Sequence, residues 1–273
     1  MSNVTFEKLT KKIGELSYLD GVSTRIIGRS ANGRAITAFH VGNRDGDQVI
    51  ITAAIHAREW ITALLVVELV KIYARADITA GGIYFVPLCN PDGVQIALGE
   101  NPLWKANARG VDLNVNFDAD WGGGAQNVRT PGPENYIGPH PASEPEVAAL
   151  VDFTMKVEPK ATVAYHSKGE VIYHGFESTT RPPSQRRLLR DRRLAKRIGK
   201  LTGYAPVKTE NSTGGYCDWV SINLGIPAFT IEVGKDEYTH PITEDKLPEI
   251  LMQNNDVPRI LLIYLLRFIH TKV

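Results

Sequence analysis

Residues 49–70, VIITAAIHAREWITALLVVELV, contain the change of pattern that decides the fold. The segment 49–55 is apolar and rich in β-branched residues, which is typical of a buried strand. HAREW follows directly at 56–60, and the apolar pattern that continues from it predicts a helix over 60–74. A buried strand that leads straight into a helix is typical of α/β proteins.

Segments of both kinds recur along the rest of the chain. Further strands are predicted at residues 24–27, 35–41, 82–88, 161–166, 171–173 and 228–233. Further helices are predicted at residues 6–16, 144–155, 185–201, 217–223 and 248–269. This alternation predicts an α/β fold with a mainly parallel or mixed sheet and helices on both faces. No linker divides the chain, so we expect one domain over 1–273, with a long loop at 121–142.

Composition narrows the functional class. The 273 residues are 43% hydrophobic and 22% charged, which excludes wholesale disorder. Thirty-one Lys and Arg against 30 Asp and Glu exclude a nucleic-acid binder that works by overall charge. Two cysteines, Cys89 and Cys217, exclude a disulfide-rich scaffold and a four-cysteine zinc site, and they leave open whether the two pair.

The sequence shows neither a transmembrane segment nor a secretory signal peptide. No apolar run approaches the roughly 20 residues that a membrane helix needs. The first 19 residues have charged and polar positions but no continuous hydrophobic region, so they do not resemble a secretory signal. We therefore expect a cytoplasmic protein with no membrane partner.

Two predicted strand ends carry possible metal ligands. His56 and Glu59 form an H-x-x-E pair at the predicted strand-to-helix junction, where both side chains can point at one spot. Such a pair also arises by chance at the surface, so alone it is weak evidence for a metal site. His166, which ends another predicted strand, strengthens the hypothesis. Ligands in α/β sheets gather outside the carboxyl ends of the strands. Two histidines and one glutamate are the ligand set of a catalytic zinc ion whose fourth position holds water.

A carboxylate stands at a third strand end. Glu232, in TIEVG at 230–234, closes the predicted strand 228–233. The plain interpretation is a glutamate that faces solvent. Beside a zinc site, it would instead be the general base for the bound water.

Seven short motifs, in order along the chain, carry a family resemblance. They are HAREW at 56–60, NPDG at 90–93, LWK at 103–105, GVDLNVNFD at 110–118, HSKG at 166–169, TGGYCDW at 213–219 and TIEVG at 230–234. With them the chain resembles the zinc carboxypeptidase family, the metallopeptidases related to carboxypeptidase A. The resemblance extends from about residue 28 to the last motif. It implies a mixed, roughly eight-stranded twisted sheet with helices on both faces.

The resemblance also implies roles for particular residues. By motif position, His56, Glu59 and His166 resemble the family's ligands for one zinc ion, and Glu232 resembles its catalytic carboxylate. Asp112 resembles the residue that orients the first histidine through its other ring nitrogen.

A cation is also needed for the oxyanion that forms when the substrate carbonyl is attacked. The family uses an arginine directly after a tryptophan. Here Trp104 is followed by Lys105, so we expect Lys105 to fill this role, with Arg109 as the alternative. A lysine supplies a point charge in place of a planar fork.

Three positions depart from the carboxypeptidase pattern. The family clamps a terminal carboxylate with an Asn-Arg pair, and this chain has Asn114 followed by Val115. A tyrosine that often closes over the substrate corresponds to Glu210. Cys217, at the expected floor of the side-chain pocket, carries no negative charge for a basic substrate residue. The absence of the clamp arginine argues against simple carboxypeptidase action, because a bidentate charge-assisted contact contributes a few kcal/mol.

One branch of the family shares these departures. HSKGEVIYHGFE at 166–177, WKANARGVDLN at 104–114 and SEPEVAAL at 143–150 resemble the bacterial γ-D-glutamyl-meso-diaminopimelate peptidases, which cut cell-wall peptides. The charges available for such a substrate include Arg58, Lys168, Glu170 and Glu210, beside Asn114 and Cys217 as further contacts.

Three functions therefore remain open. The first is a zinc peptidase that acts on a small peptide derived from peptidoglycan. The second is a zinc carboxypeptidase with a different carboxylate clamp, acting on ordinary peptides. The third is a non-catalytic peptide-binding protein, which the retained ligand set and Glu232 argue against.

A basic stretch lies outside these motifs. Residues 181–200 contain nine Lys and Arg and one acid, so the rest of the chain has a net charge of −7. Its partial apolar stripe favours the outer face of a packed helix, and attraction to an anionic partner is the alternative. No aromatic residues are interleaved with the charges, so we do not expect nucleic acid as the partner.

Overall fold

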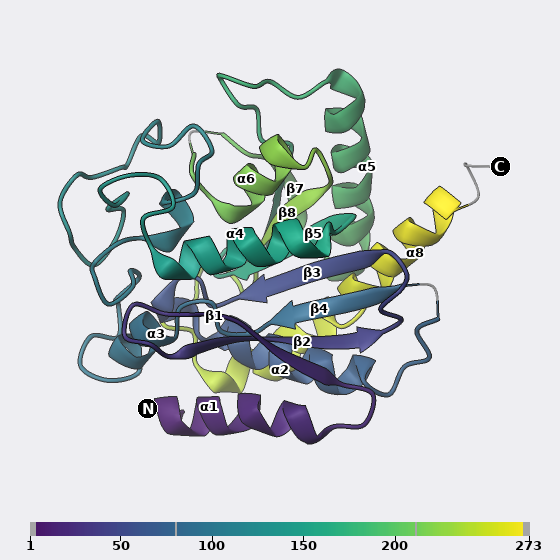
Figure 1. Cartoon of the computed structure of the whole chain (residues 1–273), viewed down its shortest axis with the longest axis horizontal. Helices are drawn as coiled ribbons and strands as arrows, with labels where there is room; N and C mark the ends of the chain where they lie inside the picture. Colours follow the sequence, from purple (N-terminus) through teal and green to yellow (C-terminus); the bar gives the residue numbers. More distant parts are fainter. Residues whose placement is uncertain (1–3, 80, 211, 270–273) are drawn as a thin grey trace.

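The computed structural model describes residues 4–79, 81–210 and 212–269. Its strands form one eight-stranded sheet in the order β1-β2-β4-β3-β5-β8-β6-β7 (Figure 1). Their bounds are β1 Ser23–Arg29, β2 Ala35–Gly42, β3 Gln48–Ala53, β4 Gly82–Val86, β5 Ala161–His166, β6 Val171–His174, β7 Ala205–Lys208 and β8 Ala228–Glu232. The predicted mixed, eight-stranded sheet is confirmed.

Strand direction brings the functional ends together. The central strands β4, β3, β5 and β8 are mutually parallel, so their carboxyl ends lie at one edge of the sheet. On one side, β2 is antiparallel to β4 and to β1. On the other side, β6 is antiparallel to β8 and β7 is parallel to β6. In α/β sheets, ligands bind outside such a row of carboxyl ends.

Helices cover both faces of the sheet, as predicted. The helices are α1 Phe6–Glu15, α2 Ile61–Tyr73, α3 Pro91–Ala97, α4 Pro145–Val157, α5 Gln185–Thr202, α6 Tyr216–Asn223, α7 Leu247–Asn254 and α8 Val257–Ile269. One hydrophobic core contains residues of α1, α2, α5, α7 and α8, and the second contains residues of α4 and α6. Figure 1 shows α4 and α1 on opposite sides of the strands.

The two-residue period of the strands decides which side chains reach the site. In β5, Tyr165 belongs to the first core and Ala164 to the second. His166 is the next residue after Tyr165, so it points to the α4 and α6 face. In β8, Ile231 belongs to the first core, and Glu232 therefore points to the same face as His166.

One predicted helix is wrong in extent. Residues 248–269 form two helices, α7 and α8, which are separated at Asn255 and Asp256. Pro258 lies in the first turn of α8. Inside a continuous helix, its ring would clash with the carbonyl of Asn254 and its missing N–H would break the hydrogen-bond ladder. The chain therefore ends one helix and begins another.

Two short elements were not predicted. Strand β7 is exposed at all four residues and contains Pro206, which argues against a strand in a pattern analysis. It forms because an edge strand needs a partner on one side only, and that partner is β6. Helix α3 begins with two residues that favour a helix start. Asn90 caps it and Pro91 lies at its first position.

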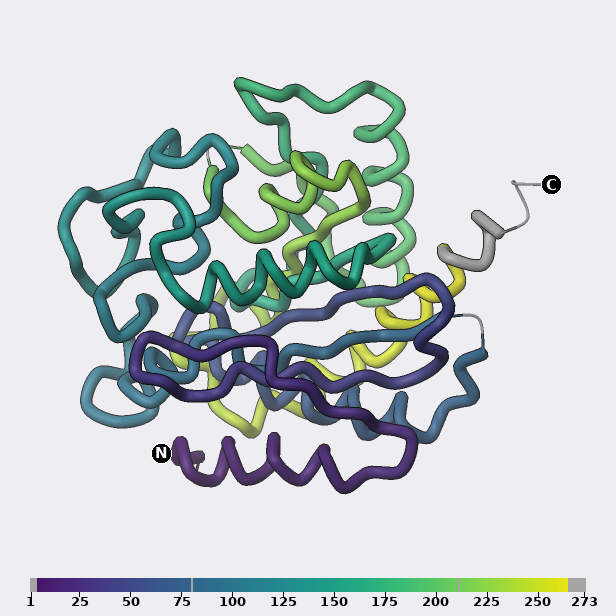
Figure 2. Tube along the Cα trace, viewed as in Figure 1, coloured from purple at the N-terminus to yellow at the C-terminus, as the bar shows by residue number. Residues whose placement is uncertain are grey.

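The long connection from α3 to α4 gathers at one side of the molecule, beyond the ends of the parallel strands (Figure 2). Within this connection, Val128 and Tyr136 form an isolated β-bridge across the predicted loop 121–142. Both cysteines are buried and unpaired. Among the described residues, no helix is long and apolar enough to cross a membrane.

Candidate metal centre

The chain after β3 turns sharply and presents two side chains. Residues Ala57–Glu59 form a single 3₁₀ turn between β3 and α2. Thr62 Oγ1 accepts a hydrogen bond from Ala54 N and donates one to Glu59 O, which ties the turn to the first residues of α2. His56 and Glu59 are both buried beside this turn.

His166 completes a compact cluster with these two residues. Glu59 Oε1 lies 2.9 Å from His56 Nδ1, and Glu59 Oε2 lies 3.0 Å from His166 Nδ1. The two Nδ1 atoms are 3.1 Å apart. All three residues are buried, and their three potential ligand atoms lie within 4.8 Å of one another.

The chemistry of this donor set fits a zinc ion. Two imidazole nitrogens and one carboxylate are the ligands of a catalytic zinc site, and the three potential ligand atoms lie close enough to share one ion. Burial lowers the pKa of His56, but the charge of Glu59 outweighs burial and raises it. Burial raises the pKa of Glu59, yet both histidines together hold it well below its usual range.

Asp112 connects His56 to Lys105. Asp112 Oδ1 lies 3.2 Å from His56 Nε2, and Asp112 Oδ2 lies 2.9 Å from Lys105 Nζ. Backbone N–H groups of Asn114 and Asn135 donate to the same carboxylate. Burial alone would raise the pKa of Asp112, but Lys105 and His56 hold it well below its usual range. The fully buried carboxylate is therefore ionised and held in one orientation.

Glu232 stands beside His166 in the sheet. The two residues are paired in register at the ends of the parallel strands β8 and β5. Ala228, Thr230 and Glu232 alternate along β8, and all three line the same cavity. Burial raises the pKa of Glu232 to about 7, against the opposing effect of His166. A carboxyl group that titrates near neutrality is suited to proton transfer.

His56 and His166 of this cluster line a cavity of about 290 Å³. Of the residues that the sequence singles out, the cavity wall contains His56, Lys105, Asn114, Val115, His166, Glu210, Cys217 and Glu232. The rest of the wall comes partly from the loop 121–142, through Gly124, Gln126, Asn127 and Asn135. Asn211, next to Glu210, lies outside the described residues.

Three expected charges lie away from this wall. Arg58 pairs with Glu134 at 3.2 Å, and Lys168 Nζ donates to Asp236 Oδ1 at 3.0 Å. Arg109 is more than half exposed and approaches Glu144. In the described part of the chain, each of these side chains contacts an acid outside the cavity. Lys105, in contrast, lines the cavity and is largely buried.

The cavity wall contains few positive charges. Among the described residues that line the cavity, Lys105 is the one lysine or arginine. The wall also offers Asn127 Nδ2 and Thr213 Oγ1, both buried and without a hydrogen-bond partner. Asn114 Oδ1 accepts from Tyr216 N at 3.1 Å, so its orientation is fixed. Apart from Lys105, the described residues of the wall can offer a substrate carboxylate hydrogen bonds but no lysine or arginine for a salt bridge.

Gly214 allows the TGGYCDW motif to lie against the backbone of Val115. Its φ is +81°, and a Cβ placed there would lie 2.7 Å from the carbonyl oxygen of Val115. A side chain at 214 would therefore collide with backbone as well as strain the left-handed conformation. The TGGYCDW motif packs against the turn after Asp112 for this reason.

The sequence analysis missed several cavity residues. Asp218 is a buried carboxyl group that lines the cavity, and its Oδ2 accepts from Gly215 N at 3.1 Å. Burial raises the pKa of Asp218 to about 7. Its position at the third residue of a helix, inside a quoted motif, is a capping signal that could have been noticed. Asn127 and Asn135 lie in a loop without periodicity, where no comparable signal exists.

Comparison with known families agrees with this geometry. Residues 12–255 match a family described as zinc carboxypeptidase. The chain belongs to the zinc carboxypeptidase family. The expected family is thereby confirmed, and the His56, Glu59 and His166 cluster supplies a suitable ligand set for the zinc that the family is named for.

Individual members of the zinc carboxypeptidase family are similar over most of this chain. The γ-D-glutamyl-L-diamino acid endopeptidase 1 of Lysinibacillus sphaericus is 32% identical over 253 residues, which cover 80% of this chain and 62% of that protein. Bovine thrombin-activatable fibrinolysis inhibitor, solved with a tick carboxypeptidase inhibitor, has a TM-score of 0.84 at 20% identity, with 97% of each chain covered. Murein-tripeptide amidase of Escherichia coli O157 has a TM-score of 0.60 at 21% identity, with 87% of this chain and 92% of that chain covered. The two structures confirm the fold.

Proposed function

We propose that this chain is a zinc-dependent peptidase that hydrolyses the amide bond between γ-D-glutamate and meso-diaminopimelate in small peptides derived from peptidoglycan. The observation that carries the proposal is that Lys105 is the one lysine or arginine among the described residues that line the cavity. Lys105 pairs with Asp112, so no second cation in this wall takes the place of the arginine with which a carboxypeptidase clamps the free carboxylate of its substrate.

His56, Glu59 and His166 would hold one zinc ion. Bound there, zinc would lower the pKa of a coordinated water and polarise the scissile carbonyl. Asp112 keeps His56 oriented through Nε2, so that Nδ1 remains directed at the metal position.

Glu232 carries the protons of the reaction. As a carboxylate, it accepts a proton from the attacking water, and as a carboxylic acid, it returns one to the leaving amine. A pKa near 7 allows both forms to exist at neutral pH. Lys105 donates to the oxygen that becomes negative when the carbonyl is attacked.

The substrate class has independent support from a relative. The endopeptidase of Lysinibacillus sphaericus is named for a γ-D-glutamyl–diamino acid bond, and 80% of this chain aligns with it. In the tripeptide L-Ala-γ-D-Glu-meso-diaminopimelate, the carboxylate next to the scissile bond is free, as in a carboxypeptidase substrate, but diaminopimelate also carries an amino group and a carboxylate at the far end of its side chain. Its recognition can therefore use charges other than a clamp on the adjacent carboxylate. Asn127 Nδ2 and Thr213 Oγ1 would donate hydrogen bonds to a carboxylate oxygen of the leaving group.

Mass spectrometry of one mixed digestion tests this function. Zinc-loaded protein is incubated with L-Ala-γ-D-Glu-meso-diaminopimelate and a set of N-blocked L-peptides that have free carboxyl ends. We expect release of diaminopimelate and no change in the L-peptides. Loss of single C-terminal L-residues would instead favour a carboxypeptidase with a different clamp. No cleavage of either, with zinc bound, would contradict the proposal and favour a peptide-binding protein.

A further inference from the structure

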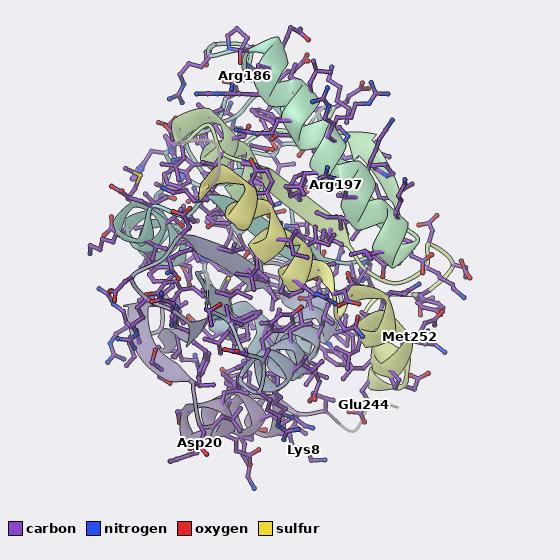
Figure 3. All side chains as sticks on the ribbon, turned by 90° about the vertical axis from the view of Figure 1, so that its right-hand side faces the viewer. Lys8, Asp20, Arg186, Arg197, Glu244 and Met252 are labelled. Carbon is purple, nitrogen blue, oxygen red and sulfur yellow. The ribbon has the colours of Figure 1, made fainter. Side chains whose placement is uncertain are left out.

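Helix α5 has a strongly basic outer face that the peptidase site does not explain. Its 18 residues run along the edge of the molecule, beside β6 and β7. Figure 3 labels Arg186 near the start of this helix and Arg197 further along it. Asp191 points inward, where it is buried and pairs with Arg190.

Six cations lie on the exposed face of α5, and we call them the stripe. They are Arg186, Arg192, Arg193, Lys196, Arg197 and Lys200. Leu194, Ala195 and Ile198 occupy the opposite, buried face. From residue 186 to residue 200 the stripe extends about 21 Å along the helix axis. Among the described residues, no carboxylate oxygen lies within 4.0 Å of any of these six side chains, and no hydrogen bond involves their charged groups.

This arrangement destabilises the isolated helix. Arg193 and Arg197, like Lys196 and Lys200, stand four residues apart and repel each other on the same surface. The chain outside residues 181–200 has a net charge of −7, so the positive charge of the protein is concentrated in this segment. The helix nevertheless keeps its charges unpaired, which is the arrangement that binding of a polyanion would stabilise.

We propose that the exposed face of α5 binds a linear poly(polyol phosphate), that is, a flexible phosphodiester polymer without bases. The stripe is long and narrow, so successive phosphates of an extended chain can each meet a cation. Arginine pairs with phosphate oxygens in a bidentate way, and four of the six cations are arginines.

Two other anionic partners, a nucleic acid and a lipid membrane, fit the exposed face of α5 less well. Helix α5 contains no aromatic residue on which a base could stack, so a nucleic acid would gain nothing from its bases. A helix that binds a lipid surface inserts a broad apolar face. In α5 the exposed large apolar residues are Leu189 and Leu201, and the main apolar face is buried in the protein.

Binding is measured with full-length protein and fluorescent poly(glycerol phosphate) across a range of salt concentrations. We expect affinity to fall steeply with salt, by roughly 0.7 in log K per log[salt] for each phosphate contact. The α5 triple variant carries Arg193→Gln, Lys196→Gln and Arg197→Gln. It should bind the polymer at least about tenfold more weakly, and the slope of log K against log[salt] should be smaller in magnitude by about 2. The matched control Lys11→Gln, Lys12→Gln, Lys156→Gln removes the same charge from exposed positions elsewhere and should bind like the parent.

Thermal unfolding separates loss of binding from loss of fold. Because glutamine is a good helix former and repulsion is removed, the α5 variant should melt at or above the parent's temperature. Equal weakening in both triple variants would overturn the proposal. So would tighter binding of single-stranded DNA with the same number of phosphates, or binding of vesicles with one-fifth anionic lipid but not of the polymer. Peptidase activity does not enter this test, so its outcome is independent of the proposed function.

Discussion

Lys105 Nζ lies 2.9 Å from Asp112 Oδ2, and the other oxygen of Asp112 faces His56. The residue proposed to stabilise the oxyanion is therefore also a partner of the residue that orients a metal ligand. Burial lowers the pKa of Lys105, but the charge of Asp112 outweighs burial and raises it. The lysine is consequently a permanent cation across the pH range in which a peptidase works.

Replacement of Lys105 by methionine should affect catalysis more than metal binding. Loss of a donor to the oxyanion costs about 10²- to 10³-fold in kcat. Asp112→Asn should weaken zinc affinity by about 10- to 100-fold. Because the two residues contact each other, their effects should not be additive in the double variant. Activity and zinc content are measured for both single variants and the double variant. Additive effects on both quantities would show that the contact has no functional role.

Glu232→Gln should retain zinc and lose nearly all turnover. Glutamine keeps the shape of the side chain beside His166 but cannot accept the proton of the attacking water. A general base contributes about 10²- to 10⁴-fold. Metal analysis and kcat are measured on the same preparation. A variant that holds zinc and turns over within about threefold of the parent would exclude Glu232 as the base.

The sequence predicted the parts of this site that lie on regular elements. His56, His166 and Glu232 follow apolar strands, and the period of a strand together with parallel pairing places strand ends at one edge. The loop 121–142 has no such period, so its contribution to the cavity through Asn127 and Asn135 could not be predicted. The same limit applies to β7, which forms through pairing with β6 and has no core pattern of its own.

Removal of the metal should destabilise the protein as well as inactivate it. Without a cation, His56, Glu59 and His166 keep two imidazoles and a carboxylate buried against one another. A chelator should therefore abolish activity and lower the Tm, and added zinc should restore both. His166→Ala should hold much less than one zinc per chain, whereas the exposed His140→Ala serves as the control and should hold one. Full zinc content in His166→Ala would contradict the assigned ligand set.

Asp218 should make stability depend on pH. Burial raises the pKa of Asp218 to about 7 in the folded protein, against an ordinary value of 3.8. The folded protein thus binds this proton more tightly, so its contribution to stability is present below pH 4 and is lost as the pH rises through about 7. The full effect is at most about 4 kcal/mol. Asp218→Asn keeps an acceptor for Gly215 N and should flatten the dependence. Urea unfolding at pH 5 and pH 8 measures this, and identical pH dependence in parent and variant would contradict it.

Val115→Arg should shift the preference toward peptides with a free C-terminal carboxylate. Val115 lines the cavity next to Asn114, so an arginine there would add a guanidinium to a wall in which Lys105 is the one cation among the described residues. A charge-assisted contact to the carboxylate of about 1.5 to 3 kcal/mol corresponds to roughly 10- to 150-fold in kcat/KM for N-blocked L-peptides. Val115→Met supplies a comparable length without charge and should not gain this activity. The two variants are compared by kcat/KM on an N-blocked dipeptide and on L-Ala-γ-D-Glu-meso-diaminopimelate. An equal gain in both variants would mean that side-chain volume at this position, and not the missing charge, limits carboxypeptidase action.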